Sequence, residues 1–145
     1  MSRRTYTYDD LLELKASAAV TATAVESLII DTCSSTSYFN GTAVIDVSAI
    51  DVTTGDENYL IHVQGSSSAT FASDVVNLAT LELGDANTGG ADVVSGIGRY
   101  ELKFGNEIPQ NGTTYRYLRL SNVVAGTSPS ITYAAFAGRD AGVSV

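Results

Sequence analysis

Apolar and polar side chains alternate along most of this chain, and the alternation is clearest between residues 100 and 136. Tyr100, Leu102 and Phe104 are separated from one another by single charged residues. A period of two is typical of a strand with one buried face. The segment leaves no room for a helix, and its pattern predicts three β-strands joined by turns.

A turn is expected after the first of these strands. Asn111 and Gly112 accept positive φ at low cost, so this pair favours a tight turn. The run that follows, residues 114–120, alternates again and places Leu118 and Leu120 on one face. We therefore expect a strand there whose leucines face the core.

Further short strands are predicted from residue 26 onward. They cover residues 27–32, 43–52, 59–64 and 76–83, and the turns between them are rich in Gly, Asn and Ser. Seven or eight short strands at this spacing predict an all-β fold, an antiparallel β-sandwich of the jelly-roll type, with under about a tenth of the residues helical. The side chains predicted to form its core are Ile29, Val44, Ile61, Leu78, Leu81, Leu102, Leu118 and Phe136.

Residues 1–25 differ from the rest of the chain, and we interpret them as an N-terminal arm that precedes a sandwich domain of residues 26–145 and docks either on the sandwich or on a neighbouring subunit. Arg and Tyr side chains often dominate the energy of interfaces, and the leucines are apolar groups that an isolated sandwich would leave uncovered. The expected contact residues of the arm are Arg3, Arg4, Tyr6, Tyr8, Leu11, Leu12 and Leu14. A frayed terminus is the alternative interpretation.

Composition and charge narrow the classes of function. The chain has 145 residues and is 44% hydrophobic, which is typical of one globular domain. Its net charge of -8 disfavours nucleic acid as a partner. Arg99, Lys103, Arg116 and Arg119 fall close together in the sequence and predict either a positive patch for an acidic partner or scattered solubilising charge. No apolar run approaches the roughly 20 residues of a membrane span, and no signal peptide is visible, so we expect synthesis in a cytoplasm.

The sequence contains no recognisable catalytic or metal-binding motif. Cys33 is the only cysteine, so no intrachain disulfide can form, and we expect it to be a small buried apolar residue. His62 is the only histidine, and no Ser or Cys accompanies it in the order of a catalytic triad. The acidic clusters lack the spacing of a calcium-binding loop. We therefore predict no enzyme activity, no metal and no cofactor.

Several segments carry a resemblance to a known group of proteins. They are residues 44–52, 55–59, 64–73, 76–84, 98–102 and 111–120. This part of the chain, about residues 42–136, resembles virion structural proteins of tailed bacteriophages. It is similar, more distantly, to the jelly-roll cement proteins that decorate phage heads. The resemblance implies a decoration protein that binds the outside of the major capsid protein lattice and clamps neighbouring capsomers.

The resemblance also implies where the protein is located and which partners it binds. The protein would be made in the host cytoplasm and located on the outer surface of the virion, with the major capsid protein and further copies of itself, as a trimer or dimer, as partners. The arm would order against one of them, and Tyr115 and Tyr117 would add interface area. The alternative is a tail-associated module or a glycan-binding β-sandwich, in which Tyr59 would join these two tyrosines as a sugar platform.

Overall fold

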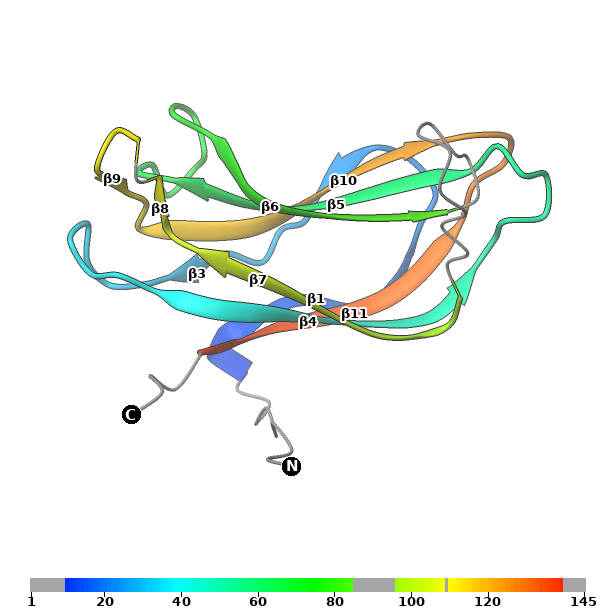
Figure 1. Ribbon diagram of the computed structural model, residues 1–145, viewed down its shortest axis with the longest axis horizontal. Helices are drawn as coiled ribbons and strands as arrows, with labels where there is room; N and C mark the ends of the chain where they lie inside the picture. Colours follow the sequence, from blue (N-terminus) through cyan, green and yellow to red (C-terminus); the bar gives the residue numbers. More distant parts are fainter. Residues whose placement is uncertain (1–9, 85–95, 109, 140–145) are drawn as a thin grey trace.

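Two antiparallel sheets pack face to face in the computed structural model, which describes residues 10–84, 96–108 and 110–139 (Figure 1). The four-stranded sheet has the order β1-β11-β4-β7. Its strands are β1 (Glu13–Val20), β11 (Ile131–Arg139), β4 (Asn40–Ile50) and β7 (Gly98–Gly105). It forms the lower layer in Figure 1.

The second sheet has five strands. Along its main path the order is β2-β10-β5-β6, and β3 also pairs with β10. Its strands are β2 (Ala24–Val25), β10 (Tyr117–Ala125), β5 (Asn58–Ser66), β6 (Val76–Gly84) and β3 (Ile30–Asp31). A separate hairpin joins β8 (Glu107–Ile108) to β9 (Thr113–Thr114) across the predicted Asn-Gly turn, where Gly112 has a φ of 62°.

The predicted all-β, antiparallel sandwich is confirmed. In the described residues the only helical segment is the 3-10 turn η1 (Asp10–Leu12). Seven of the described strands are long, with 8 to 11 residues each, and the other four have two residues each. The predicted strand at 27–32 is shorter than expected, because only Ile30 and Asp31 pair with β10.

The prediction that residues 1–25 form an arm separate from the sandwich is wrong for the described part of this segment. Residues 13–20 form β1, which pairs with β11 at the edge of the four-stranded sheet, and residues 24–25 form β2 in the other sheet. Leu14 is fully buried in the core. The weak pattern of this segment hid the strand, because β1 is an edge strand whose middle residues are exposed on both faces. Residues 1–9 lie outside the described part.

The core forms between the inward faces of the two sheets. Alternation on β4 directs Ala43, Ile45 and Val47 inward, and on β10 it directs Leu118 and Leu120 inward. All five of these side chains are at most 3% exposed. Burial of such apolar surface is the main favourable term in folding.

Most of the predicted core is confirmed. Ile61 and Leu118 are buried in the core, and Leu78, Leu81 and Leu102 pack against it while partly exposed. Val44 and Phe136 are also buried, but they pair with each other and alternate with the inward-facing Ile45 and Ala135, so they lie on the outer face of the four-stranded sheet. The prediction that Ile29 belongs to the core is wrong, because this residue is 42% exposed while its neighbour Ile30 is buried. The cause is register: β3 begins at Ile30, which lies opposite Leu118 and therefore faces inward.

One end of the sandwich is tied by contacts between two turns. Asp56 accepts hydrogen bonds from the backbone nitrogen of Thr127 (3.0 Å) and from its hydroxyl (2.7 Å). Gly126, with a φ of 115°, lies so close that a Cβ atom there would be 2.7 Å from the Cα atom of Glu57. Glu57 is itself buried and accepts hydrogen bonds from the Thr54 hydroxyl and from the backbone nitrogen of Gly55 (2.9 Å). These turns therefore fix how β4–β5 and β10–β11 are connected.

We predict that Leu118→Ala lowers the free energy of unfolding by about 2–5 kcal/mol, because it leaves a cavity at a fully buried site. Ile29→Ala is the matched control and should cost less than about 1 kcal/mol, because that side chain is partly in water. Urea unfolding followed by circular dichroism measures both. Equal losses would contradict the assignment of faces.

A second prediction concerns acid. Hydrogen bonds from the Thr54 hydroxyl and from backbone amides hold the pKa of Glu57 below its usual range. The ionised Glu57 side chain therefore stabilises the folded protein fully when the pH is above its pKa in the unfolded chain, about 4.3. This stabilisation is lost as the pH falls through the lower pKa of Glu57 in the folded protein. In the Glu57→Gln variant, the free energy of unfolding should decrease less steeply as the pH is lowered through this range. An unchanged slope would show that the carboxylate does not matter.

Candidate functional site

The expected contact residues do not form one surface. Leu14 and Tyr115 are buried, with exposures of 0% and 3%, so both are wrong as contact residues. Leu12 and Tyr117 are partly buried, and Leu11 is 84% exposed. The remaining four expected residues, Arg3, Arg4, Tyr6 and Tyr8, lie outside the described residues.

The predicted sugar platform is also wrong. Tyr59 is 1% exposed, and its hydroxyl donates to the carbonyl oxygen of Asp51 (2.7 Å) inside the fold. Tyr115 is buried, and it packs where Gly65 leaves room. The ring of Tyr117 lies under the guanidinium of Arg116, at 5.2 Å. Three tyrosines in this arrangement cannot present their faces to one sugar.

Two residues with reactive side chains have structural surroundings. Cys33 is exposed, contrary to the expectation of burial, and its backbone adopts a φ of 67° while its nitrogen donates to Asp31 (2.8 Å). His62 forms a hydrogen bond with the Thr80 hydroxyl (2.7 Å), and burial lowers the pKa of its imidazole. Neither residue has the partners of a nucleophile–base pair among the described residues.

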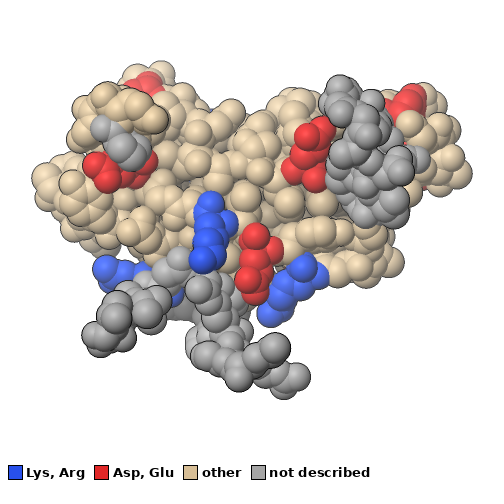
Figure 2. All heavy atoms as spheres, viewed as in Figure 1, with Lys and Arg blue, Asp and Glu red and all other residues tan. Residues whose placement is uncertain are grey.

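The basic residues do not gather into one patch. Arg99 and Lys103 lie on β7 in the four-stranded sheet, whereas Arg119 lies on β10 in the other sheet. Arg99 forms a two-pronged ion pair with Asp46, with N–O distances of 2.6 and 2.8 Å. On the face seen in Figure 2, a few separate Lys and Arg side chains lie along the lower side, over the four-stranded sheet, with an acidic group between them. The charge is therefore distributed and partly neutralised.

An exposed apolar surface runs along one edge of the five-stranded sheet. It consists of Val25, Leu28, Ile29 and Val123, and we call it the apolar edge. The exposures of these residues are 52%, 36%, 42% and 38%. Val25 lies on β2, opposite Ser121 of β10, and Leu28 and Ile29 continue along the same edge toward β3. Exposed apolar side chains that lie near one another at a sheet edge are a candidate interaction site.

A buried polar cluster lies where the edges of the two sheets approach each other. Lys15 provides its amine from β1, at a position between two register shifts of the β1–β11 pairing. Such irregularities place the consecutive side chains of Leu14 and Lys15 both inside, at 0% and 4% exposure. The amine donates to the carbonyl oxygens of Ala18 (3.0 Å) and Ala16 (3.1 Å) on the same strand.

The other members of this Lys15 cluster are Glu26, Asn122 and Tyr133. The Lys15 Nζ atom lies 4.0 Å from Glu26 Oε1, and Asn122 Nδ2 donates to the same oxygen at 2.7 Å. The hydroxyl of Tyr133 donates to Asn122 Oδ1 at 2.5 Å. Lys15 also lies over the Tyr133 ring, 4.9 Å from its centre. Lys15 and Tyr133 come from one sheet and Asn122 from the other, so the cluster joins the two layers.

Burial sets the electrostatics of the Lys15 cluster. Loss of water lowers the pKa of Lys15, while the charge of Glu26 opposes this shift. Burial raises the pKa of Tyr133, so its hydroxyl stays protonated and remains a hydrogen-bond donor. Every buried side-chain nitrogen and oxygen in the described residues has a hydrogen-bond partner. The cluster is therefore fully satisfied, as buried polar groups must be to avoid a large desolvation cost.

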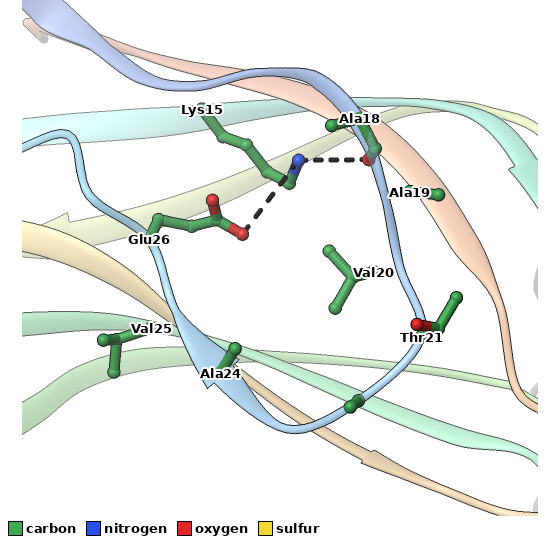
Figure 3. A pocket seen from close by; sticks show the side chains of 9 residues that line it. Lys15, Ala18, Ala19, Val20, Thr21, Ala24, Val25 and Glu26 are labelled. Atoms are coloured by element: carbon green, nitrogen blue, oxygen red, sulfur yellow. Dashed lines mark hydrogen bonds and ion pairs between the residues drawn. The ribbon is translucent and has the colours of Figure 1, made fainter.

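A pocket of about 310 Å³ opens beside the Lys15 amine (Figure 3). It is lined by Lys15 and by residues 18–22 and 24–26, most of them small. Figure 3 shows the amine directed between the backbone of Ala18 and the carboxylate of Glu26. The Glu26 side chain is 21% exposed, so solvent reaches this end of the cluster.

None of these four residues was predicted from the sequence to meet in a cluster. A usable sign was present, because Asn122 follows Leu118 and Leu120 at the same period of two and so falls on the apolar face. The position of Lys15 was hidden, since the register shifts that turn it inward depend on pairing with β11, more than a hundred residues away.

No protein-family model matches this chain, and no curated protein matches it. Among the described residues, no group of His, Cys, Asp or Glu side chains is placed to hold a metal ion. No helix in the described part of the chain is both long and apolar enough to cross a membrane.

Proposed function

We propose that this protein is a decoration (cement) protein of a tailed-phage capsid that binds the outside of the major capsid protein lattice. The observation that carries the proposal is the apolar edge, whose four residues are at least 36% exposed. A surface of this kind beside a rigid sandwich suits a structural binding role. The sequence resemblance over residues 42–136 supplies the class of partner.

The strand order supports a jelly-roll version of the sandwich. With β2 and β3 taken as one interrupted strand and the β8–β9 hairpin set aside, eight strands remain. One sheet then holds the first, eighth, third and sixth strands, and the other holds the second, seventh, fourth and fifth. Two four-stranded sheets built from eight strands are the arrangement of jelly rolls, which occur in capsid domains.

The apolar edge is the proposed contact with the capsid. β2 and β3 have two residues each, and residues 27–29 between them expose Leu28 and Ile29. A long straight edge strand would favour uncontrolled pairing through its backbone. An interrupted edge favours recognition through side chains instead, which suits a contact repeated at defined lattice positions. Weak contacts repeated by symmetry give avidity.

Self-association as a trimer or dimer belongs to the same proposal. Capsid lattices offer threefold and twofold positions, and closed symmetry is the usual outcome for soluble homo-oligomers. The molar mass of the purified protein in solution and its arrangement on the particle test this part. Isolated monomers in both settings would contradict it.

The location on the head is tested by copy number. Hundreds of copies per particle are expected for a decoration protein, whereas a handful would favour the alternative, a module of the tail. Quantitative mass spectrometry of purified particles measures the ratio to the major capsid protein.

The contact is tested with heads that lack the protein. The double change Val25→Asp with Ile29→Asp should weaken binding by on the order of tenfold or more, because charge is placed in a contact that must lose water. Val75→Asp is the matched control: Val75 is 38% exposed but precedes β6 at the opposite edge of the same sheet. Equal binding by both variants would exclude the apolar edge.

A deletion of residues 2–9 completes this test. It removes the four expected contact residues that lie outside the described part and leaves β1 whole. Weaker binding after this deletion alone would move the contact to the N-terminal residues.

A further inference from the structure

The Lys15 cluster places an amine and a carboxamide against the same carboxylate oxygen. Lys15 Nζ lies 4.0 Å from Glu26 Oε1, and Asn122 Nδ2 lies 2.7 Å from it. Lys15 and Asn122 are 4% and 1% exposed, so neither group competes with bulk water for its partners. An ion pair alone would not require a buried carboxamide to share its acceptor.

The carboxamide of Asn122 is also polarised at its oxygen. The Tyr133 hydroxyl donates to Oδ1 at 2.5 Å, and Tyr133 is fully buried. When a nucleophile adds to the amide carbon, negative charge develops on this oxygen, and a fixed donor in a dry site stabilises that charge strongly. Burial lowers the pKa of Lys15, which increases the share of the neutral amine, the form that can attack.

We propose that Lys15 and Asn122 join spontaneously in an isopeptide bond between their side chains. Nζ forms a bond to Cγ of Asn122, and the bond from Cγ to Nδ2 breaks. One of the three protons of the Lys15 ammonium group stays on the new amide. The other two pass in turn through the carboxylate of Glu26 to Nδ2, which leaves as ammonium. Charge and atoms balance, and no oxidant or cofactor enters the reaction.

The surroundings suit both the reaction and its product. Glu26 already accepts a hydrogen bond from the nitrogen that must leave, and it ends the reaction in its starting state. Glu26, which holds the leaving nitrogen, also lines the pocket beside the amine, so ammonium can leave past this carboxylate to solvent. The product would fasten β1, an edge strand of one sheet, to β10 of the other sheet. An edge strand held in this way cannot peel from the sandwich, which would suit the proposed place on the outside of a virion.

The test is the intact mass of the full-length purified protein. A bond between Lys15 and Asn122 lowers the mass by one ammonia, about 17 Da relative to the sequence. Trypsin does not cleave after an amide-linked lysine, so peptides 5–15 and 120–139 should be absent from the digest. A single species containing residues 5–99 joined to residues 120–139 should replace them.

The masses of variants distinguish this cross-link from other reactions that release ammonia. Lys15→Met and Asn122→Ala should have their full sequence masses, and Glu26→Gln should stay unlinked because it cannot carry the protons. Lys103→Met changes the only other lysine, which is exposed, and should still lose about 17 Da. Loss of ammonia in Lys15→Met would instead indicate a succinimide and overturn the proposal. The full sequence mass for the wild-type protein, with both peptides present, would overturn it even if every variant failed to fold.

Discussion

The exclusion of water between the two inward faces is the constraint on which the rest of this structure depends. Leu118 and Leu120 on one sheet and Ile45 and Tyr133 on the other are fully buried. Neither sheet could keep its apolar face in water, and each provides the cover for the other. The turns at the end of the sandwich, with Asp56 bound to Thr127, then hold the layers in one relative position.

The same dry interior changes the chemistry of the few polar groups inside it. A lysine, a glutamate, an asparagine and a tyrosine would be unremarkable on a surface, where water competes for every hydrogen bond. In the Lys15 cluster the pKa of Lys15 is lowered and that of Tyr133 is raised, both by burial. Electrostatic contacts are also stronger where water is scarce. The reactivity proposed for Lys15 and Asn122 therefore arises from the packing of the sheets and from no special residue type.

The two proposed roles of this protein fall in different parts of the sandwich, one in the interior and one on the surface. The interior carries the proposed cross-link, while the apolar edge of the five-stranded sheet carries the proposed contact with the capsid lattice. The two lie near each other, because Val25 belongs to the apolar edge and also lines the pocket beside Lys15. A sandwich locked at β1 and β10 would offer a more rigid edge, and rigidity before binding reduces the entropy lost on docking.

Local pattern was sufficient for the parts of the fold that depend on neighbours in sequence. The alternation of Tyr100, Leu102 and Phe104, and the turn at Asn111 and Gly112, depend on side-chain period and backbone preference alone, and both agree with the structure. The sequence by itself therefore determined the class of fold and most of the core. It also contains a sign of the buried Asn122, which continues the period of two set by Leu118 and Leu120.

Only the tertiary structure decided which face an irregular segment presents. Ile29 is exposed and Ile30 buried because β3 begins opposite Leu118, and Lys15 is buried because the β1–β11 pairing shifts register on both sides of it. A shift of one residue reverses the face of every side chain that follows. Register is set by a partner strand far away in the chain, so no local pattern can contain it. The meeting of Lys15, Glu26, Asn122 and Tyr133 is decided at that level.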